Sequence, residues 1–197
     1  MKKLAAMLCL SAMTTGAFAQ GLINFNNSPT TLISANIGGN VATLSGASGT
    51  YLFGLLTSAQ AAGPFTFASV YGTNLVNTSG GRFTGGNGVA VNGWAPGVTM
   101  FYEIAAWASA GGNTTFKPAW VNANGTPASS GLPSLFGVSA IASGAAGGGP
   151  NALPPLPLFG GASGLTQGFT LTGVPEPTSM ALAGLGAAAL LIFRRRK

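Results

Sequence analysis

Few side chains in this sequence could take part in acid–base, nucleophilic or metal chemistry. The chain has no histidine, a single cysteine and only two acidic residues, Glu103 and Glu176. Glu103 could act with Lys117 and a serine, but general acid–base and nucleophilic mechanisms need an activating partner beside the reactive group. Zinc and calcium sites need clusters of ligands that the chain lacks. We therefore predict that the protein is not an enzyme and has no metal or cofactor site.

Aromatic side chains are the other residues with binding potential. Trp94 and Trp120 are flanked by turn residues, so they are the two candidates for stacking on a carbohydrate. Trp107 lies in an apolar run and is predicted to belong to the core, since buried aromatic rings supply much of a small core. The glycine-rich stretch 85–88 is similar to a phosphate loop, but no lysine follows it and no helix is indicated. We predict a turn there.

The positive charge of the chain is concentrated at its two ends. The formal net charge is +6, from eight Lys and Arg residues against two acids. Six of these cations lie in the terminal segments, namely Lys2, Lys3, Arg194, Arg195, Arg196 and Lys197. Only Arg82 and Lys117 remain between them. A nearly uncharged central region lacks the basic face that phosphate contacts require, so we predict that the protein does not bind nucleic acid.

The first 19 residues have the organisation of a secretory signal peptide. Lys2 and Lys3 precede a mostly apolar stretch, and Ala17 and Ala19 place small residues at the two positions that signal peptidase reads. We predict a helix that is cleaved before Gln20. The single cysteine, Cys9, would leave with it, so the mature protein would contain neither a thiol nor a disulfide.

The C-terminal end has three features of a membrane-sorting segment. Val174, Pro175, Glu176 and Pro177 form a short proline-bracketed acidic motif, and residues 180–193 are apolar. As a helix this run is about 21 Å long, at about 1.5 Å per residue. A bilayer core of roughly 30 Å normally needs about 20 apolar residues. We therefore predict a short transmembrane helix over residues 178–193 that is a poor permanent anchor.

The basic residues that end the chain would fix its orientation, since flanking cations stay on the cytoplasmic side. These stop-transfer residues are Arg194, Arg195, Arg196 and Lys197. Together with the proline motif and the apolar run, they resemble the PEP-CTERM sorting signal of bacterial envelope proteins. The resemblance covers residues 174–197. It implies recognition by an exosortase-type transpeptidase in the inner membrane, cleavage near the motif, and transfer to the cell surface or an extracellular polymer matrix.

Residues 20–173 have the length of one domain and the composition of an all-β protein. Strands are predicted over 21–26, 51–56, 65–71, 98–107 and 169–172, separated by Gly and Asn turns. The 98–107 run is apolar at both parities, which is typical of a central strand, and Glu103 is expected to find a hydroxyl, amide or cation partner there. Residues 144–168 are rich in Gly and Pro and are predicted to form a surface loop or an extended crossover. The predicted fold is an antiparallel β-sandwich.

These patterns predict an exported, non-enzymatic protein with a structural or interaction role at the surface or in the matrix. Its expected partners are signal peptidase, an exosortase-type transpeptidase and, through the C-terminal helix, the membrane. The first alternative is a carbohydrate-binding module of the extracellular matrix, with exopolysaccharide as the partner. The second is an unprocessed single-pass membrane protein.

Overall fold

A computed structural model describes residues 20–76, 80–161, 164–174 and 185–186. The predicted signal peptide, the basic C-terminal cluster and all but two residues of the predicted transmembrane helix lie outside these ranges. Among the described residues, none forms a helix with both the length and the apolar character needed to cross a membrane.

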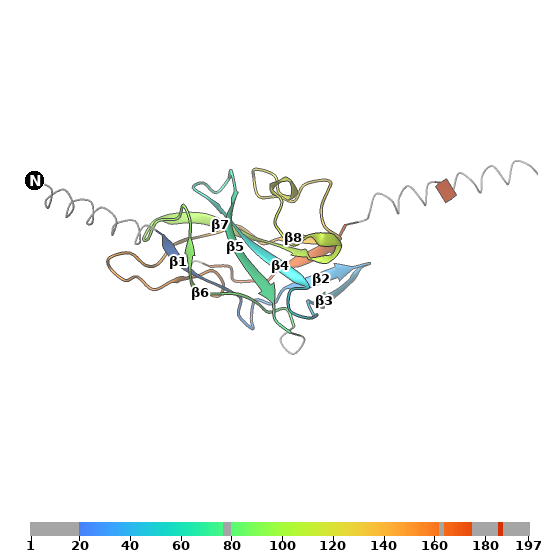
Figure 1. Cartoon of the computed structure of the whole chain (residues 1–197), viewed down its shortest axis with the longest axis horizontal. Coiled ribbons are helices and arrows are strands. Elements are labelled where there is room, and N and C mark those ends of the chain that lie inside the picture. Colours follow the sequence, from blue (N-terminus) through green and yellow to red (C-terminus); the bar gives the residue numbers. More distant parts are fainter. Residues whose placement is uncertain (1–19, 77–79, 162–163, 175–184, 187–197) are drawn as a thin grey trace, which may run out of the picture.

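The described residues form a β-rich domain (Figure 1). Its strands are β1 (Gly21–Asn26), β2 (Ser34–Ile37), β3 (Asn40–Thr43), β4 (Tyr51–Ser58), β5 (Thr66–Asn74), β6 (Phe83–Val91), β7 (Thr99–Ala108), β8 (Leu135–Val138), β9 (Ala142–Ala145), β10 (Leu156–Pro157) and β11 (Thr170–Gly173). Two short 3₁₀ turns, η3 (Ala110–Gly112) and η4 (Pro118–Trp120), lie between β7 and β8.

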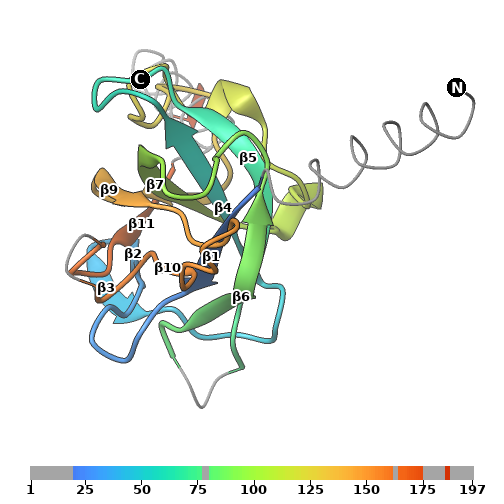
Figure 2. The same ribbon diagram turned by 90° about the vertical axis from the view of Figure 1, so that its left-hand side faces the viewer.

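All of these strands belong to one hydrogen-bonded sheet. Their order is β10-β1-β6-β5-β4-β7-β8-β11-β2-β3, and β9 pairs with β7 beside β8. Figure 2 shows how the sheet curls, with β1, β5 and β6 on one side and β2, β3 and β11 on the other. The predicted β-rich class is confirmed. A sandwich of two separate sheets is not confirmed, because β7 and β8 continue the pairing from one side of the curl to the other.

The strand predictions with the clearest alternation correspond to observed strands. In β1, Ile23 and Phe25 are fully buried and share one face, as a period of two residues requires. The predicted central strand is β7, which pairs with β4, β8 and β9. Successive residues of β7 from Tyr102 to Ala108 are all buried, so both faces of this strand are covered.

Two hydrophobic clusters cover those faces. The inner cluster lies within the curl of the sheet and receives side chains from most strands. It comprises Ile23, Phe25, Ile33, Ala35, Leu44, Phe53, Leu55, Ala68, Val70, Phe83, Val91, Trp94, Tyr102, Ile104, Ala106, Ala146, Leu156, Leu158, Phe159, Leu165 and Leu171. The outer cluster lies on the other face of β4, β7 and β8. It comprises Leu56, Phe65, Ala105, Trp107, Phe116, Trp120 and Phe136.

Two segments differ from the sequence predictions. Residues 144–168 are more than a surface loop: Leu156 and Pro157 form β10 at one edge of the sheet, and apolar side chains of the segment, including Leu158 and Phe159, are buried. Proline is compatible with this position because an edge strand leaves one row of amide groups unpaired. The glycine-rich stretch 85–88 is not a turn. It lies within β6, where the pairing with β1 shifts register as in a β-bulge.

Candidate functional site

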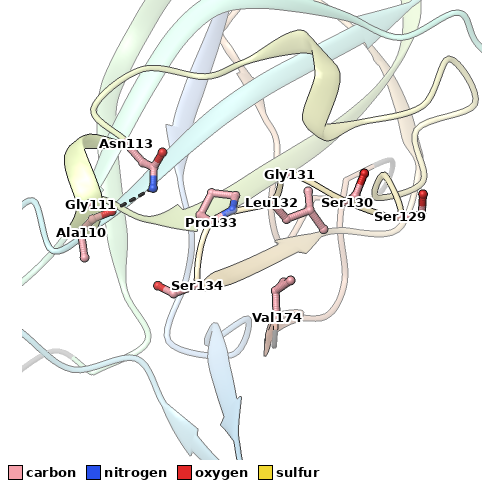
Figure 3. Close-up of a pocket in the computed structure, with 10 residues that line it drawn as sticks. All are labelled: Ala110, Gly111, Asn113, Ser129, Ser130, Gly131, Leu132, Pro133, Ser134 and Val174. Atoms are coloured by element: carbon pink, nitrogen blue, oxygen red, sulfur yellow. Dashed lines mark hydrogen bonds between the residues drawn. The ribbon is translucent and has the colours of Figure 1, made fainter. Parts of the chain in front are cut away.

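A surface cavity lies where β11 ends. It has a volume of about 380 Å³. It is lined by Ala110, Gly111, Asn113, Ser129, Ser130, Gly131, Leu132, Pro133, Ser134 and Val174 (Figure 3). We call residues 110–113 and 129–134 the collar. The collar and Val174 come from segments that are far apart in the sequence, and the fold brings them together.

β11 is paired with strands on both sides until the chain reaches the cavity. It lies between β8 and β2, pairing antiparallel with the former and parallel with the latter. Leu171 is fully buried in the inner cluster, and Gly173 pairs with Leu135. The amide of Val174 then donates a hydrogen bond to the carbonyl oxygen of Ser134 at 2.9 Å. Val174 is therefore attached to the domain, although it directly precedes Pro175.

One side of the collar is held at the adjoining ends of β4 and β7. The amide nitrogen of Ser109 donates to the carbonyl oxygen of Thr50 at 3.0 Å, and η3 follows. The side chain of Asn113 donates to the carbonyl oxygen of Ala110 at 2.8 Å, the bond drawn in Figure 3. The indole nitrogen of Trp107 donates to the carbonyl oxygen of Asn113 at 2.8 Å. A fully buried tryptophan thus positions this side of the cavity.

The other side of the collar rests on the outer cluster. The amide of Ala128 donates to the carbonyl oxygen of Trp120 at 2.9 Å, just before the collar begins. Leu132 and Val174 are partly buried against the outer cluster, and Pro133 is buried. Ser129, Ser130 and Ser134 are exposed. Hydroxyl groups therefore surround an apolar floor.

None of the described residues that line this cavity is ionisable. Its chemistry consists of hydroxyl groups, one amide side chain, main-chain polar groups and apolar surface. Such a lining can hold an uncharged peptide or loop through hydrogen bonds and apolar contacts. It offers no general base to activate a serine hydroxyl, which nucleophilic catalysis would require.

The glutamate of the domain lies elsewhere. Glu103 is buried in β7, and its Oε1 atom has no hydrogen-bond partner among the described residues. The expected polar partner for this oxygen is therefore not found. Burial raises the pKa of Glu103 from its ordinary value of 4.5 to about 8. Gly125 lies directly against the carboxyl group, and a Cβ atom at this position would overlap it.

The remaining candidates from the sequence have structural positions. The carbohydrate interpretation of Trp94 and Trp120 is wrong in its premise, because their exposed fractions are 0% and 2%. Trp94 donates from its indole nitrogen to the carbonyl oxygen of Val98 at 2.7 Å, and Trp120 packs against Trp107 in the outer cluster. The side-chain nitrogen of Lys117 lies 5.6 Å from the centre of the Trp120 ring. Trp107 is fully buried, as predicted.

The predicted processing residues are described only in part. Val174 lies at the cavity, whereas Pro175, Glu176, Pro177, the basic cluster, Ala17 and Ala19 lie outside the described residues. Sequence reasoning missed the collar. The change from apolar β7 to a stretch rich in Gly, Ser and Pro indicates a long loop, but it does not indicate that this loop meets the end of the last strand.

Comparison with protein families identifies the C-terminal segment. Residues 173–197 match the model of the PEP-CTERM protein-sorting motif. This motif is recognised by exosortase and implies export and sorting to the cell surface. Comparison with curated proteins found no match, and comparison with solved structures found none either. The matched segment begins at Gly173, so its first two residues lie inside the folded domain.

Proposed function

Because the chain ends in a PEP-CTERM protein-sorting motif, we propose that its C-terminal segment is a processed signal that delivers a non-enzymatic domain to the cell surface or the extracellular polymer matrix. There the domain has a structural or interaction role. In this proposal, signal peptidase removes residues 1–19 and an exosortase-type transpeptidase cleaves near Pro175, Glu176 and Pro177. The membrane holds the intermediate through residues 178–193.

The position of the sheet between the two predicted processing points carries this proposal. Gly21 begins β1 one residue after the predicted cleavage before Gln20, and its amide donates to the carbonyl oxygen of Trp94 at 2.6 Å. At the other end, β11 finishes at Gly173, two residues before Pro175. Removal of both terminal segments would therefore leave every described strand in place. A domain with this layout suits release from both membrane segments.

A non-enzymatic role is favoured by the chemistry of the domain. Among the described residues, Oε1 of its one glutamate has no hydrogen-bond partner that could activate it, and those that line the cavity at β11 do not ionise. The carbohydrate-binding alternative has lost its two proposed platforms, because Trp94 and Trp120 are core residues.

Cell fractionation in the native host tests the processing proposal. An epitope placed within the domain should be recovered at lower mass in the surface or matrix fraction, with Gln20 as its first residue by N-terminal sequencing. Glu176→Ala should trap the longer form in the inner membrane, because it removes the acidic group of the motif. Gln167→Ala, a comparable truncation at an exposed position of the domain, is the control and should be processed normally.

Two outcomes would contradict the proposal. If the full-length chain is the sole species found with or without Glu176→Ala, the protein is an unprocessed single-pass membrane protein. If the N-terminus is Met1, the first 19 residues are not a cleaved signal peptide.

A further inference from the structure

The sorting motif follows the folded domain without a linker. Gly173 is paired in the sheet, and Val174 is hydrogen-bonded to Ser134. Residues 175–177 come next, and three residues of extended chain span at most about 11 Å. The predicted membrane helix begins one residue later. An enzyme in the membrane that grips the motif must therefore approach the surface around Val174.

The end of β11 is poorly suited to detach and provide slack. Leu171 is fully buried, and the strand is paired on both sides. Release of Val174 would also expose the part of the outer cluster against which Val174 and Leu132 pack. Burial of apolar surface opposes this opening. The enzyme is thus expected to meet the domain in its folded form.

The surface that it would meet is the collar. It is hollowed, and the exposed hydroxyls of Ser129, Ser130 and Ser134 surround its apolar floor. No ionisable side chain is found among the described residues that line it, so these residues contribute no charge to the recognition of a partner. A partner would be recognised by shape, hydrogen bonds and apolar contact, which suits an uncharged loop beside an active site at the membrane surface.

We infer that the collar is the docking surface for a loop of the exosortase-type enzyme that processes the motif. The inference rests on the proposed function. It assigns to the domain a part in its own sorting: the collar orients the substrate while the enzyme holds residues 175–177. The occupant is an uncharged loop of the enzyme, because the described residues that line the cavity offer no charge to pair with.

Substitutions at Ser130 test the collar directly. Ser130→Arg and Ser130→Glu place opposite charges on its rim, and both should slow processing of the epitope-tagged full-length chain in the native host by about fivefold or more, the size of effect typical of important interface residues. The matched controls are Asn92→Arg and Asn92→Glu. Asn92 is exposed and directly follows β6, whose last residue Val91 pairs with Gly21 at the start of β1. Figure 1 shows β1 and β8, the neighbour of β11, toward opposite ends of the domain.

Inserting Gly-Ser-Gly-Ser between Val174 and Pro175 tests whether the collar helps the enzyme to bind or hinders its access to the motif. If the collar docks the enzyme, the insertion slows processing and removes the effect of the Ser130 substitutions. Faster processing after the insertion would mean that the collar is an obstacle, and normal processing of both Ser130 variants would overturn the inference. Proteolysis of the intact chain in membranes checks that each variant is folded. Failure of the proposed function itself is distinct, because the wild-type chain would then not be cleaved.

Discussion

The inner and outer clusters meet at β7 but are built differently. Tyr102, Ile104 and Ala106 enter the inner cluster, whereas Ala105 and Trp107 enter the outer one. The inner cluster is enclosed by strands from around the curl. The outer cluster is covered mainly by the segment between β7 and β8, whose regular structure consists of two short 3₁₀ turns and an isolated β-bridge between Val121 and Pro127. The same strand therefore supports a closed core on one face and the base of a loop surface on the other.

Two neighbouring polar side chains of β7 differ in the same way. The hydroxyl group of Tyr102, on the inner face, donates to the carbonyl oxygen of Leu158 at 3.0 Å. Glu103, the next residue, lies on the outer face, where no described residue is a hydrogen-bond partner of Oε1. Buried polar groups without partners are costly. The inner face thus pairs its buried tyrosine hydroxyl, while the outer face, which carries the collar, holds one buried carboxyl oxygen at a cost in stability.

The largest expected loss of stability comes from replacing one tryptophan in each of the two clusters. Trp94→Ala in the inner cluster and Trp107→Ala in the outer cluster should each lower the free energy of unfolding by about 3–5 kcal/mol, as for other large buried aromatics. Both side chains are fully buried and donate a hydrogen bond to a main-chain carbonyl oxygen. Urea unfolding of residues 20–174 measures these losses.

Limited proteolysis would show whether the outer cluster, and not the inner one, holds residues 109–134 in place. Trp107→Ala should increase cleavage within residues 109–134, because it removes the bond to Asn113. Trp94→Ala should not single out this segment. Equal cleavage in both variants would break the distinction between a closed core and a loop support.

A smaller effect is expected from the pH dependence of Glu103. Its pKa is raised from 4.5 to about 8 by burial, so the folded state holds its proton over a pH range in which the unfolded chain has lost it. The stability is then highest below about pH 4.5 and falls as the pH rises toward 8. The slope is at most about 1.4 kcal/mol per pH unit, which gives about 2–4 kcal/mol between pH 5 and pH 8.

Glu103→Gln should remove this dependence and stabilise the domain at pH 8 relative to the wild type. Thermal unfolding at pH 5 and pH 8 measures the difference for both proteins. Gln167→Ala, at an exposed position, should retain the wild-type dependence. An unchanged pH profile in Glu103→Gln would show that the outer face does not carry the cost assigned to it.

The sequence predicted the elements that depend on local pattern. The alternation in β1 and the two-sided apolar run in β7 are visible because burial selects residue types along one strand. The sorting motif was equally accessible, since its proline, glutamate, apolar and basic residues are contiguous. The single curled sheet was not predicted. It depends on pairings between distant segments, such as β1 with β10 and β2 with β11, that local patterns do not specify.

The cavity at the end of β11 was not predicted from the sequence for the same reason. Ser129, Ser130 and Ser134 are ordinary loop residues in the sequence, and only the pairing of β8 with β11 brings them to Val174. For Trp94 and Trp120, the sequence suggested a binding role that the structure does not support. Neighbouring turn residues indicated exposure, but each ring is turned into a cluster supplied by distant strands or loops.

The smallest expected loss of stability comes from removing the hydroxyl group of one tyrosine on each face of the sheet. Tyr102→Phe leaves the carbonyl oxygen of Leu158 without its partner inside the inner cluster, and should cost about 1–2 kcal/mol. Tyr71 accepts a hydrogen bond from the amide of Phe116 at 3.2 Å on the outer side, but it is 39% exposed. Water can replace its hydroxyl group, so Tyr71→Phe should cost about 0.5 kcal/mol or less. Urea unfolding of both variants measures the difference. If Tyr71→Phe proved the more costly change, the loop over the outer cluster would be as tightly determined as the core, and the division drawn at β7 would be wrong.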